Sequence, residues 1–288
     1  MIPSLLSRVP RSWAEYGASR SRQIPWLQGI RNRILASLKN VEGVISKGPA
    51  SGLRFNAGPS DSRFLLGTFE PAAQRILGRC LRAGDVFFDI GANVGFFSVL
   101  AARFVGPSGE IHAFEPLPAN ARQIANNVAL NEFSQIEVHE IALSERDGTF
   151  AFRVSAVPTF GALSDSPMAV DQEIASVDVT VRALDSWMGE NKARSPRLIK
   201  LDIEGSEVGF LKGAQETIEK CRPVLLIELH GTNEPVAAFF ESRSYTVDIV
   251  GGGDLRTAPW AALAVAVPEE LGETRISLRA ICQEIESR

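Results

Sequence analysis

Apolar residues recur with two different spacings between residues 71 and 267. Short apolar runs rich in Val, Ile and Phe predict strands, and these runs occupy residues 86–90, 110–114, 136–139, 149–154, 177–181, 197–201, 224–229, 245–250 and 262–267. Apolar positions at helical spacing predict helices, and they occupy residues 71–81, 96–104, 118–130, 184–188, 207–219 and 235–241. Alternating strands and helices predict an α/β fold, a Rossmann-like, doubly wound, mostly parallel seven-stranded sheet with helices on both faces.

Composition divides the chain into three segments. Residues 1–50 contain eight Arg or Lys residues against two Glu residues, and residues 51–61 are rich in Gly, Pro, Ser and Asn. This predicts a basic, helical N-terminal extension at 1–50, one large domain at 51–268 and a C-terminal helical tail at 269–288. A basic extension is typical of transit peptides, of arms that bind nucleic acid or membrane surfaces, and of solvated helices; we favour the last interpretation.

Charge and composition exclude several classes of protein. The 288 residues are 45% hydrophobic and carry a formal net charge of -4, which suits a packed domain. No apolar run approaches the roughly 20 residues that cross a bilayer, and the first residues lack a secretory signal, so we expect a cytoplasmic protein with no transmembrane segment. The acidic body lacks a broad phosphate-binding face, and we expect no nucleic-acid partner. Cys80, Cys221 and Cys282 match neither a disulfide nor a metal-binding pattern.

A glycine-containing turn follows the first strand of the domain. We assign five of its residues to cofactor binding: Asp89, Gly91, Ala92, Asn93 and Gly95. Gly91 allows a ligand to approach the backbone closely, and the helix that starts near Asn93 presents free N–H groups. Dinucleotide sites prefer Gly-x-Gly-x-x-Gly, whereas the spacing here is Gly-x-x-x-Gly, and Asp89 would repel a pyrophosphate. The turn therefore favours S-adenosylmethionine (SAM), which is cationic, over NAD.

The ends of the next two strands complete the predicted cofactor site. Glu115 ends the second strand, twenty residues after Gly95. A carboxylate at this place accepts hydrogen bonds from ribose hydroxyls. We assign the adjacent Pro116 to the same site. Ala142, after the third strand, is positioned to contact the adenine, although core packing explains it equally well.

Acidic residues and a histidine end two later strands. Asp202 and Glu204 follow one strand, and Glu228 and His230 lie at the end of the next. Because the carboxyl ends of parallel strands meet at one edge of a sheet, we expect these four side chains in one crevice. Methyl transfer to an alcohol requires alignment of the acceptor and removal of its proton. We therefore assign all four residues to catalysis, with Asp202 as the first choice of base.

Two further interpretations concern the same region. Mg²⁺ or Mn²⁺ held by these carboxylates is an alternative way to lower the pKa of the acceptor, although no residue is assigned as a metal ligand. Ser206 and Glu207 are interpreted as the start of a helix, where serine caps the end and acids favour the helix dipole.

These motifs resemble the FkbM family of methyltransferases. The similarity extends from about Thr68 to Val267 and includes DIGANVGFFS, AFEP, IALSERDG, RALDSWM, IKLDIEGSE and VLLIELH. The resemblance implies that 51–268 is a SAM-dependent methyltransferase domain acting on a hydroxyl of a sugar, glycolipid, polyketide or related small metabolite. A small-molecule or glycan acceptor is thus the expected partner. It also implies that Glu70 covers the cofactor, whereas helix initiation before Pro71 is the alternative for this residue.

Two competing functions remain as hypotheses. One is a protein or RNA methyltransferase that docks its substrate with the basic extension at 1–50. The other is a dinucleotide-dependent oxidoreductase, which Asp89 and the missing middle glycine disfavour. Residues 157–164 diverge from the family's acceptor-side loop, so the sequence does not specify the acceptor.

Overall fold

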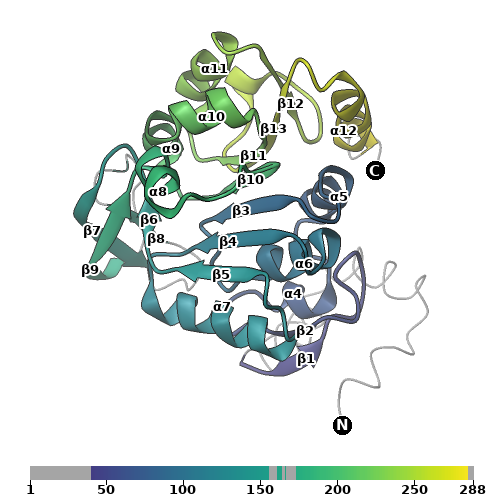
Figure 1. The fold of residues 1–288 in the computed structure, drawn as a ribbon, viewed down its shortest axis with the longest axis vertical. Coiled ribbons are helices and arrows are strands. Elements are labelled where there is room, and N and C mark those ends of the chain that lie inside the picture. Colours follow the sequence, from purple (N-terminus) through teal and green to yellow (C-terminus); the bar gives the residue numbers. More distant parts are fainter. Residues whose placement is uncertain (1–39, 156–160, 164–165, 167–172, 285–288) are drawn as a thin grey trace, which may run out of the picture.

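The computed structural model describes residues 40–155, 161–163, 166 and 173–284, and its centre is a seven-stranded sheet (Figure 1). The strands follow the order β12-β13-β11-β10-β3-β4-β5. Their bounds are β3 (Val86–Ile90), β4 (Glu110–Phe114), β5 (Ile136–His139), β10 (Leu198–Leu201), β11 (Val224–Leu229), β12 (Tyr245–Ile249) and β13 (Ala262–Pro268). Neighbouring strands from β11 to β5 are parallel, whereas β13 is antiparallel to β11 and β12. The predicted mostly parallel seven-stranded sheet is confirmed.

Helices cover both faces of this sheet. One face carries α5 (Pro71–Cys80), α6 (Phe96–Val105), α7 (Pro118–Leu130) and α12 (Gly272–Glu284). The other carries α8 (Leu184–Asn191), α9 (Glu207–Gly213), α10 (Gln215–Cys221) and α11 (Asn233–Glu241). Successive side chains of β3 alternate between the two cores, since Phe87 belongs to one and Phe88 to the other. A strand that is buried on both faces therefore has a continuous apolar run in its sequence.

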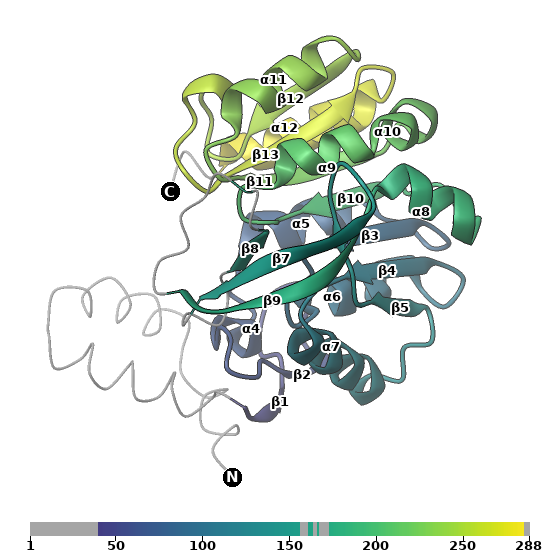
Figure 2. The same ribbon diagram turned by 90° about the vertical axis from the view of Figure 1, so that its left-hand side faces the viewer.

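A smaller sheet lies apart from the main one (Figure 2). Its order is β6-β9-β7-β8, with bounds β6 (Ala142–Leu143), β7 (Gly148–Ser155), β8 (Gly161–Leu163) and β9 (Glu173–Arg182). The long strands β7 and β9 pair antiparallel, so the strands predicted at 149–154 and 177–181 exist but do not join the main sheet. Phe152 and Leu163 belong to its apolar core. These two side chains also line the cleft described below.

Residues before α5 pack on the main body of the protein. The strands β1 (Glu42–Val44) and β2 (Arg54–Asn56) form a hairpin, followed by the short helix α4 (Arg63–Leu66). Ile45 and Ala50 are buried in the core beside α5 and α6, and Asn127 of α7 accepts a hydrogen bond from the Asn56 N–H at 2.8 Å. The end of the predicted 1–50 extension is therefore in contact with the domain, and residues 1–39 lie outside the described residues.

The prediction of a single helix at 207–219 is wrong, because the structure has two helices, α9 and α10, with a break at Ala214. Gly213, just before the break, lies so close to Ser144 that a Cβ at this position would be 2.0 Å from the Ser144 carbonyl oxygen. Tertiary packing therefore sets the end of α9.

After β12 follows a short 3-10 helix, η1 (Leu255–Thr257). Within the described part of the chain, no helix combines the length and apolar character needed to cross a membrane.

Candidate active site

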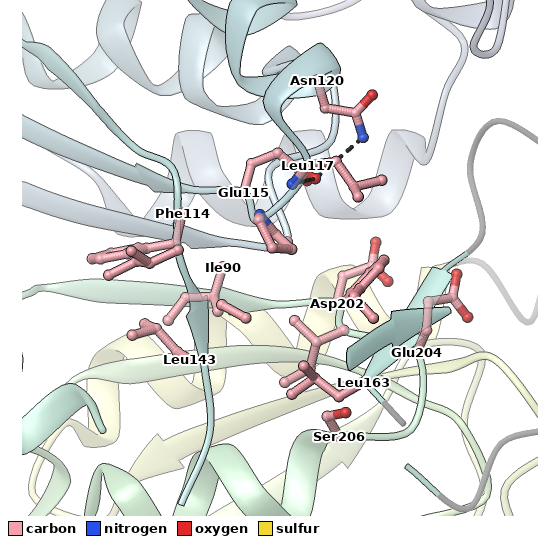
Figure 3. Close-up of a pocket in the computed structure, with 16 residues that line it drawn as sticks. Ile90, Phe114, Glu115, Leu117, Asn120, Leu143, Leu163, Asp202, Glu204 and Ser206 are labelled. Carbon is pink, nitrogen blue, oxygen red and sulfur yellow. Dashed lines mark hydrogen bonds between the residues drawn. The ribbon is translucent and has the colours of Figure 1, made fainter. Parts of the chain in front are cut away.

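A cleft opens at the carboxyl ends of β3, β4 and β10, where a parallel sheet of this kind binds its ligand (Figure 3). It encloses ≈ 720 Å³ of space outside protein atoms, including its open side. Glu115 and Asn120 lie on one side of the cleft, and Asp202 and Glu204 lie on the other. Its lining residues further include Ile90, Gly91, Phe114, Pro116, Leu117, Ile141, Ala142, Leu143, Phe152, Leu163, Ile203 and Ser206.

The predicted glycine turn borders this cleft. Gly91 has a φ of +77°, and a Cβ on it would lie 1.9 Å from the carbonyl oxygen of Asp202. The need for glycine therefore comes from contact with the neighbouring strand end, in addition to any contact with a ligand. Gly95 has a φ of +82°, and a Cβ there would lie 2.9 Å from Ile124 of α7. Ala92 is buried behind the turn and is not among the lining residues.

Glu115 is 5% exposed and is held by three donors. Its carboxylate accepts hydrogen bonds from the N–H of Asn93 at 2.9 Å, the N–H of Leu117 at 3.1 Å and Asn120 Nδ2 at 3.2 Å. Burial outweighs these bonds and raises the pKa of Glu115 to about 7. The side chain thus stands at the predicted place on the cleft wall, with Oε2 accepting only one of these bonds.

Lys200 is a site residue that the sequence reasoning missed. It is 3% exposed on β10, in register with Asp89 of β3. Its Nζ lies 3.0 Å from Asp202 Oδ2 and 4.9 Å from the centre of the Phe97 ring. Burial alone would lower the pKa of Lys200, but the charges of Asp202, Glu70 and Asp89 raise it above its usual value. A lysine inside an otherwise apolar strand is a signal that the sequence does contain.

Three buried oxygen atoms around Lys200 and the glycine turn have no hydrogen-bond donor. They are Glu70 Oε2, Asp89 Oδ1 and Asn93 Oδ1. Asp89 is 1% exposed, with Oδ2 accepting a hydrogen bond from Ser98 Oγ at 2.6 Å, and burial raises its pKa. Glu70 precedes α5 without capping it, because its side chain makes no capping hydrogen bond. Unsatisfied acceptors of this kind suit a ligand that carries ammonium and sulfonium charges. None of these three residues is among those that line the cleft.

The four residues predicted to share a crevice do come together. Ligand-type atoms of Asp202, Glu204 and His230 all lie within 4.8 Å of one another, and the same holds for Glu70, Asp202 and Glu228. Burial first, and the charge of Asp202 second, raise the pKa values of Glu204 and Glu228 to about 8 each. The structure thus brings the four side chains together with Glu70, although Glu228 and His230 are not among the residues that line the cleft.

Glu207 was interpreted only as part of a helix start, but it is a partner of His230. His230 Nδ1 lies 2.9 Å from Glu207 Oε1, and Glu207 Oε2 accepts a hydrogen bond from Thr232 Oγ1 at 2.9 Å. On the other side of the ring, Nε2 lies 3.3 Å from Glu204 Oε2. Burial by itself lowers the pKa of His230, but the hydrogen bond to Glu207 and the charges of Glu204 and Asp202 raise it to about 9. The imidazole is therefore protonated at neutral pH.

Known proteins match this chain over the region that contains the cleft. A family model described as the methyltransferase FkbM domain matches residues 89–248, more than half of the chain. The 2-O-methyltransferase NoeI of Sinorhizobium fredii is 28% identical over 163 residues, covering 52% of this chain and 65% of that protein. The 31-O-demethyl-FK506 methyltransferase FkbM of Streptomyces tacrolimicus is 27% identical over 197 residues, covering 58% and 75% of the two chains.

A solved structure, methyltransferase FkbM from Methylobacillus flagellatus KT, is 21% identical, has a TM-score of 0.45, and covers 71% of this chain and 52% of that chain. The family model includes the glycine turn, Glu115 and all four predicted catalytic residues. The family match favours a methyltransferase over the dinucleotide-dependent oxidoreductase alternative. The chain belongs to the methyltransferase FkbM family and is a SAM-dependent methyltransferase.

Proposed function

We propose that this enzyme transfers the methyl group of SAM to a hydroxyl oxygen of a small metabolite or glycan. The main support is the cluster of partly buried carboxylates at and beside the cleft, two of which have pKa values near 8. A base with such a pKa accepts a proton efficiently close to neutral pH. The names of the two relatives above support O-methylation, and both are O-directed enzymes by those names.

The cleft and the buried residues near it offer separate surfaces for the parts of SAM. Glu115 would accept hydrogen bonds from the ribose hydroxyls. The apolar side chains of Ile141 and Leu163 would contact the adenine between the main sheet and the smaller sheet. The unsatisfied oxygens of Glu70 and Asp89 would receive the ammonium group. SAM supplies an electrophilic methyl group when bound, and the protein must align the acceptor and take its proton.

We propose Glu204 as the proton acceptor, in place of Asp202. Glu204 lines the cleft, and its backbone has a φ of 50°, an unusual conformation for this residue type. Asp202 is instead paired with Lys200 at 3.0 Å, which favours a positioning role. His230, protonated and held by Glu207, would keep the Glu204 carboxylate oriented toward the acceptor hydroxyl.

We propose that this proton transfer needs no divalent cation. A cation at Asp202 would face the Lys200 ammonium 3.0 Å from Oδ2, a repulsion that is strong in a buried site. Turnover by EDTA-treated enzyme should therefore be the same with and without added Mg²⁺ or Mn²⁺. A clear rise on addition of either ion would place a metal in the chemistry.

The acceptor class is tested with methyl-labelled SAM and the full chain, supplied with fractionated small molecules, glycans, protein or RNA. We expect label in the small-molecule or glycan fraction, as a methyl ether that resists mild alkali. Label released as methanol would indicate a carboxyl ester and contradict hydroxyl methylation. Label in protein or RNA would support the macromolecular alternative, and loss of that labelling on deletion of residues 1–39 would assign the docking to the basic extension.

A further inference from the structure

Two histidines and a glutamate meet at the edge of the main sheet, outside the catalytic cluster. His112 lies on β4, and Glu137 and His139 lie on the edge strand β5. The two parallel strands place His112 directly beside Glu137 and Phe114 beside His139. Since paired residues on neighbouring strands point to the same face, all three polar side chains share one face of the sheet.

The distances among these side chains suit a tetrahedral metal ion. His112 Nδ1 lies 3.0 Å from His139 Nε2 and 3.7 Å from Glu137 Oε2, and all three ligand atoms lie within 4.8 Å of one another. Zinc bonds of about 2.0–2.1 Å at tetrahedral angles place two ligand atoms about 3.4 Å apart. The two shorter distances lie on either side of that value, so an ion needs only small side-chain adjustments to bind.

A second observation concerns the other nitrogen of His112. This residue is 7% exposed, and its Nε2 is buried without a hydrogen-bond partner. Glu110 Oε2 lies 3.8 Å from that nitrogen. A histidine that binds a metal through one nitrogen commonly donates the other N–H to a carboxylate, which fixes its tautomer. Glu110 stands where such a carboxylate is needed.

An aromatic side chain packs against both histidine rings and holds them in place. The Trp187 ring centre lies 5.2 Å from that of His112 and 4.9 Å from that of His139. Glu137 has a side chain that is 68% exposed, which gives an ion in water access to the site.

We propose that His112, Glu137 and His139 bind a transition-metal dication such as Zn²⁺, with water completing the coordination. Two histidines and one carboxylate form a recognised ligand set for zinc. None of the three residues lines the cofactor cleft, which favours a structural role for the ion over a catalytic one. His139 contacts Phe114 with ring centres 4.9 Å apart, and Phe114 lines the cofactor cleft. A bound ion would therefore fix the edge of the sheet that supports the cleft wall.

Zinc binding to the metal-stripped full chain, measured by calorimetry and by elemental analysis after dialysis, tests the proposal. We expect one ion per chain in the wild type, loss of that ion in His139→Gln, and retention in His230→Gln, which disrupts the catalytic cluster instead. The reverse pattern would place the ion in the catalytic cluster. If the folded wild type binds no zinc, the two histidines are only a hydrogen-bonded pair. Either the reverse pattern or the absence of zinc binding would overturn the proposal.

Two variants that leave both histidines in place distinguish loss of zinc binding from misfolding. Glu137→Gln changes an exposed side chain, so the metal-free variant should unfold at the wild-type temperature but lose the rise in unfolding temperature that Zn²⁺ gives the wild type. Glu110→Gln should weaken zinc binding about 10- to 100-fold. Quenching of Trp187 fluorescence by Co²⁺, absent in Trp187→Phe, gives a local readout. Wild-type zinc affinity in both glutamate variants would contradict the assigned ligand set.

Discussion

At the scale of single residues, the site places buried cationic groups among several carboxylates. Lys200 lies beside Asp89 and Asp202, and its positive charge offsets part of their negative charge. The sequence reasoning identified Asp89 as a negative charge that selects SAM. In the structure Asp89 is buried in register with Lys200, and its Oδ1 has no hydrogen-bond partner.

Lys200→Met should therefore destabilise the fold strongly. Removing one member of a buried ion pair leaves an uncompensated charge and costs about 3–5 kcal/mol. The exposed pair of Lys212 and Glu145, with side chains 52% and 57% exposed, provides the control. Lys212→Met should change the free energy of unfolding by about 0–1 kcal/mol. Urea unfolding measures both, and equal small effects would mean that Lys200 is not needed to balance the cluster.

Glu204→Gln tests the proposed base. Removing the carboxylate should lower turnover about 10²- to 10⁴-fold, while the SAM dissociation constant stays within a few-fold of the wild type. Glu234, on α11 with a side chain 69% exposed, is a matched control, since Glu234→Gln should leave both quantities unchanged. The pH profile of kcat/KM should also lose its rise near pH 8. Near-normal turnover in Glu204→Gln would return the role of base to Asp202 or Glu228.

At the scale of elements, the ends of strands carry the site and the contacts between those ends constrain it. The β3 turn and the end of β10 approach so closely that Gly91 has no room for a side chain. The β6-β9-β7-β8 sheet, inserted between β5 and β10 in the chain, contributes Phe152 and Leu163 to the cleft. Neither contact leaves a distinctive pattern in the sequence, because each joins segments far apart along the chain.

Comparing Gly91→Ala with Gly84→Ala separates the cost of this close contact from the cost of a left-handed backbone. Gly84 also has a positive φ, +85°, but its nearest neighbour to an added Cβ is Ser108 Oγ at 3.8 Å. Gly84→Ala should cost about 1–2 kcal/mol for the left-handed backbone alone. Gly91→Ala adds a collision at 1.9 Å with the Asp202 carbonyl oxygen, so it should lower the free energy of unfolding further and weaken SAM binding. Equal costs for the two variants would show that the strand ends can move apart.

At the scale of the whole molecule, the acid cluster predicts how stability depends on pH. The folded-state pKa values of Glu204 and His230 are about 8 and about 9, above the usual values of 4.5 and 6.5. Both groups therefore bind protons more tightly in the folded state, and their contribution to stability is lost as the pH rises through those values. We expect a lower urea midpoint at pH 9 than at pH 6.5, and a smaller difference in Glu204→Gln. A midpoint that rises with pH would contradict the raised pKa values.

The sequence by itself determined the order of elements, the main sheet and the strand ends that hold the predicted residues. Those features follow from local periodicity and from the rule that parallel strands end at one edge. The tertiary structure alone decided the separate smaller sheet, the break between α9 and α10, and the partnership of Glu207 with His230. It also decided which carboxylate is paired with Lys200. Charge balance and close contact depend on residues that are distant in the chain, so no local pattern encodes them.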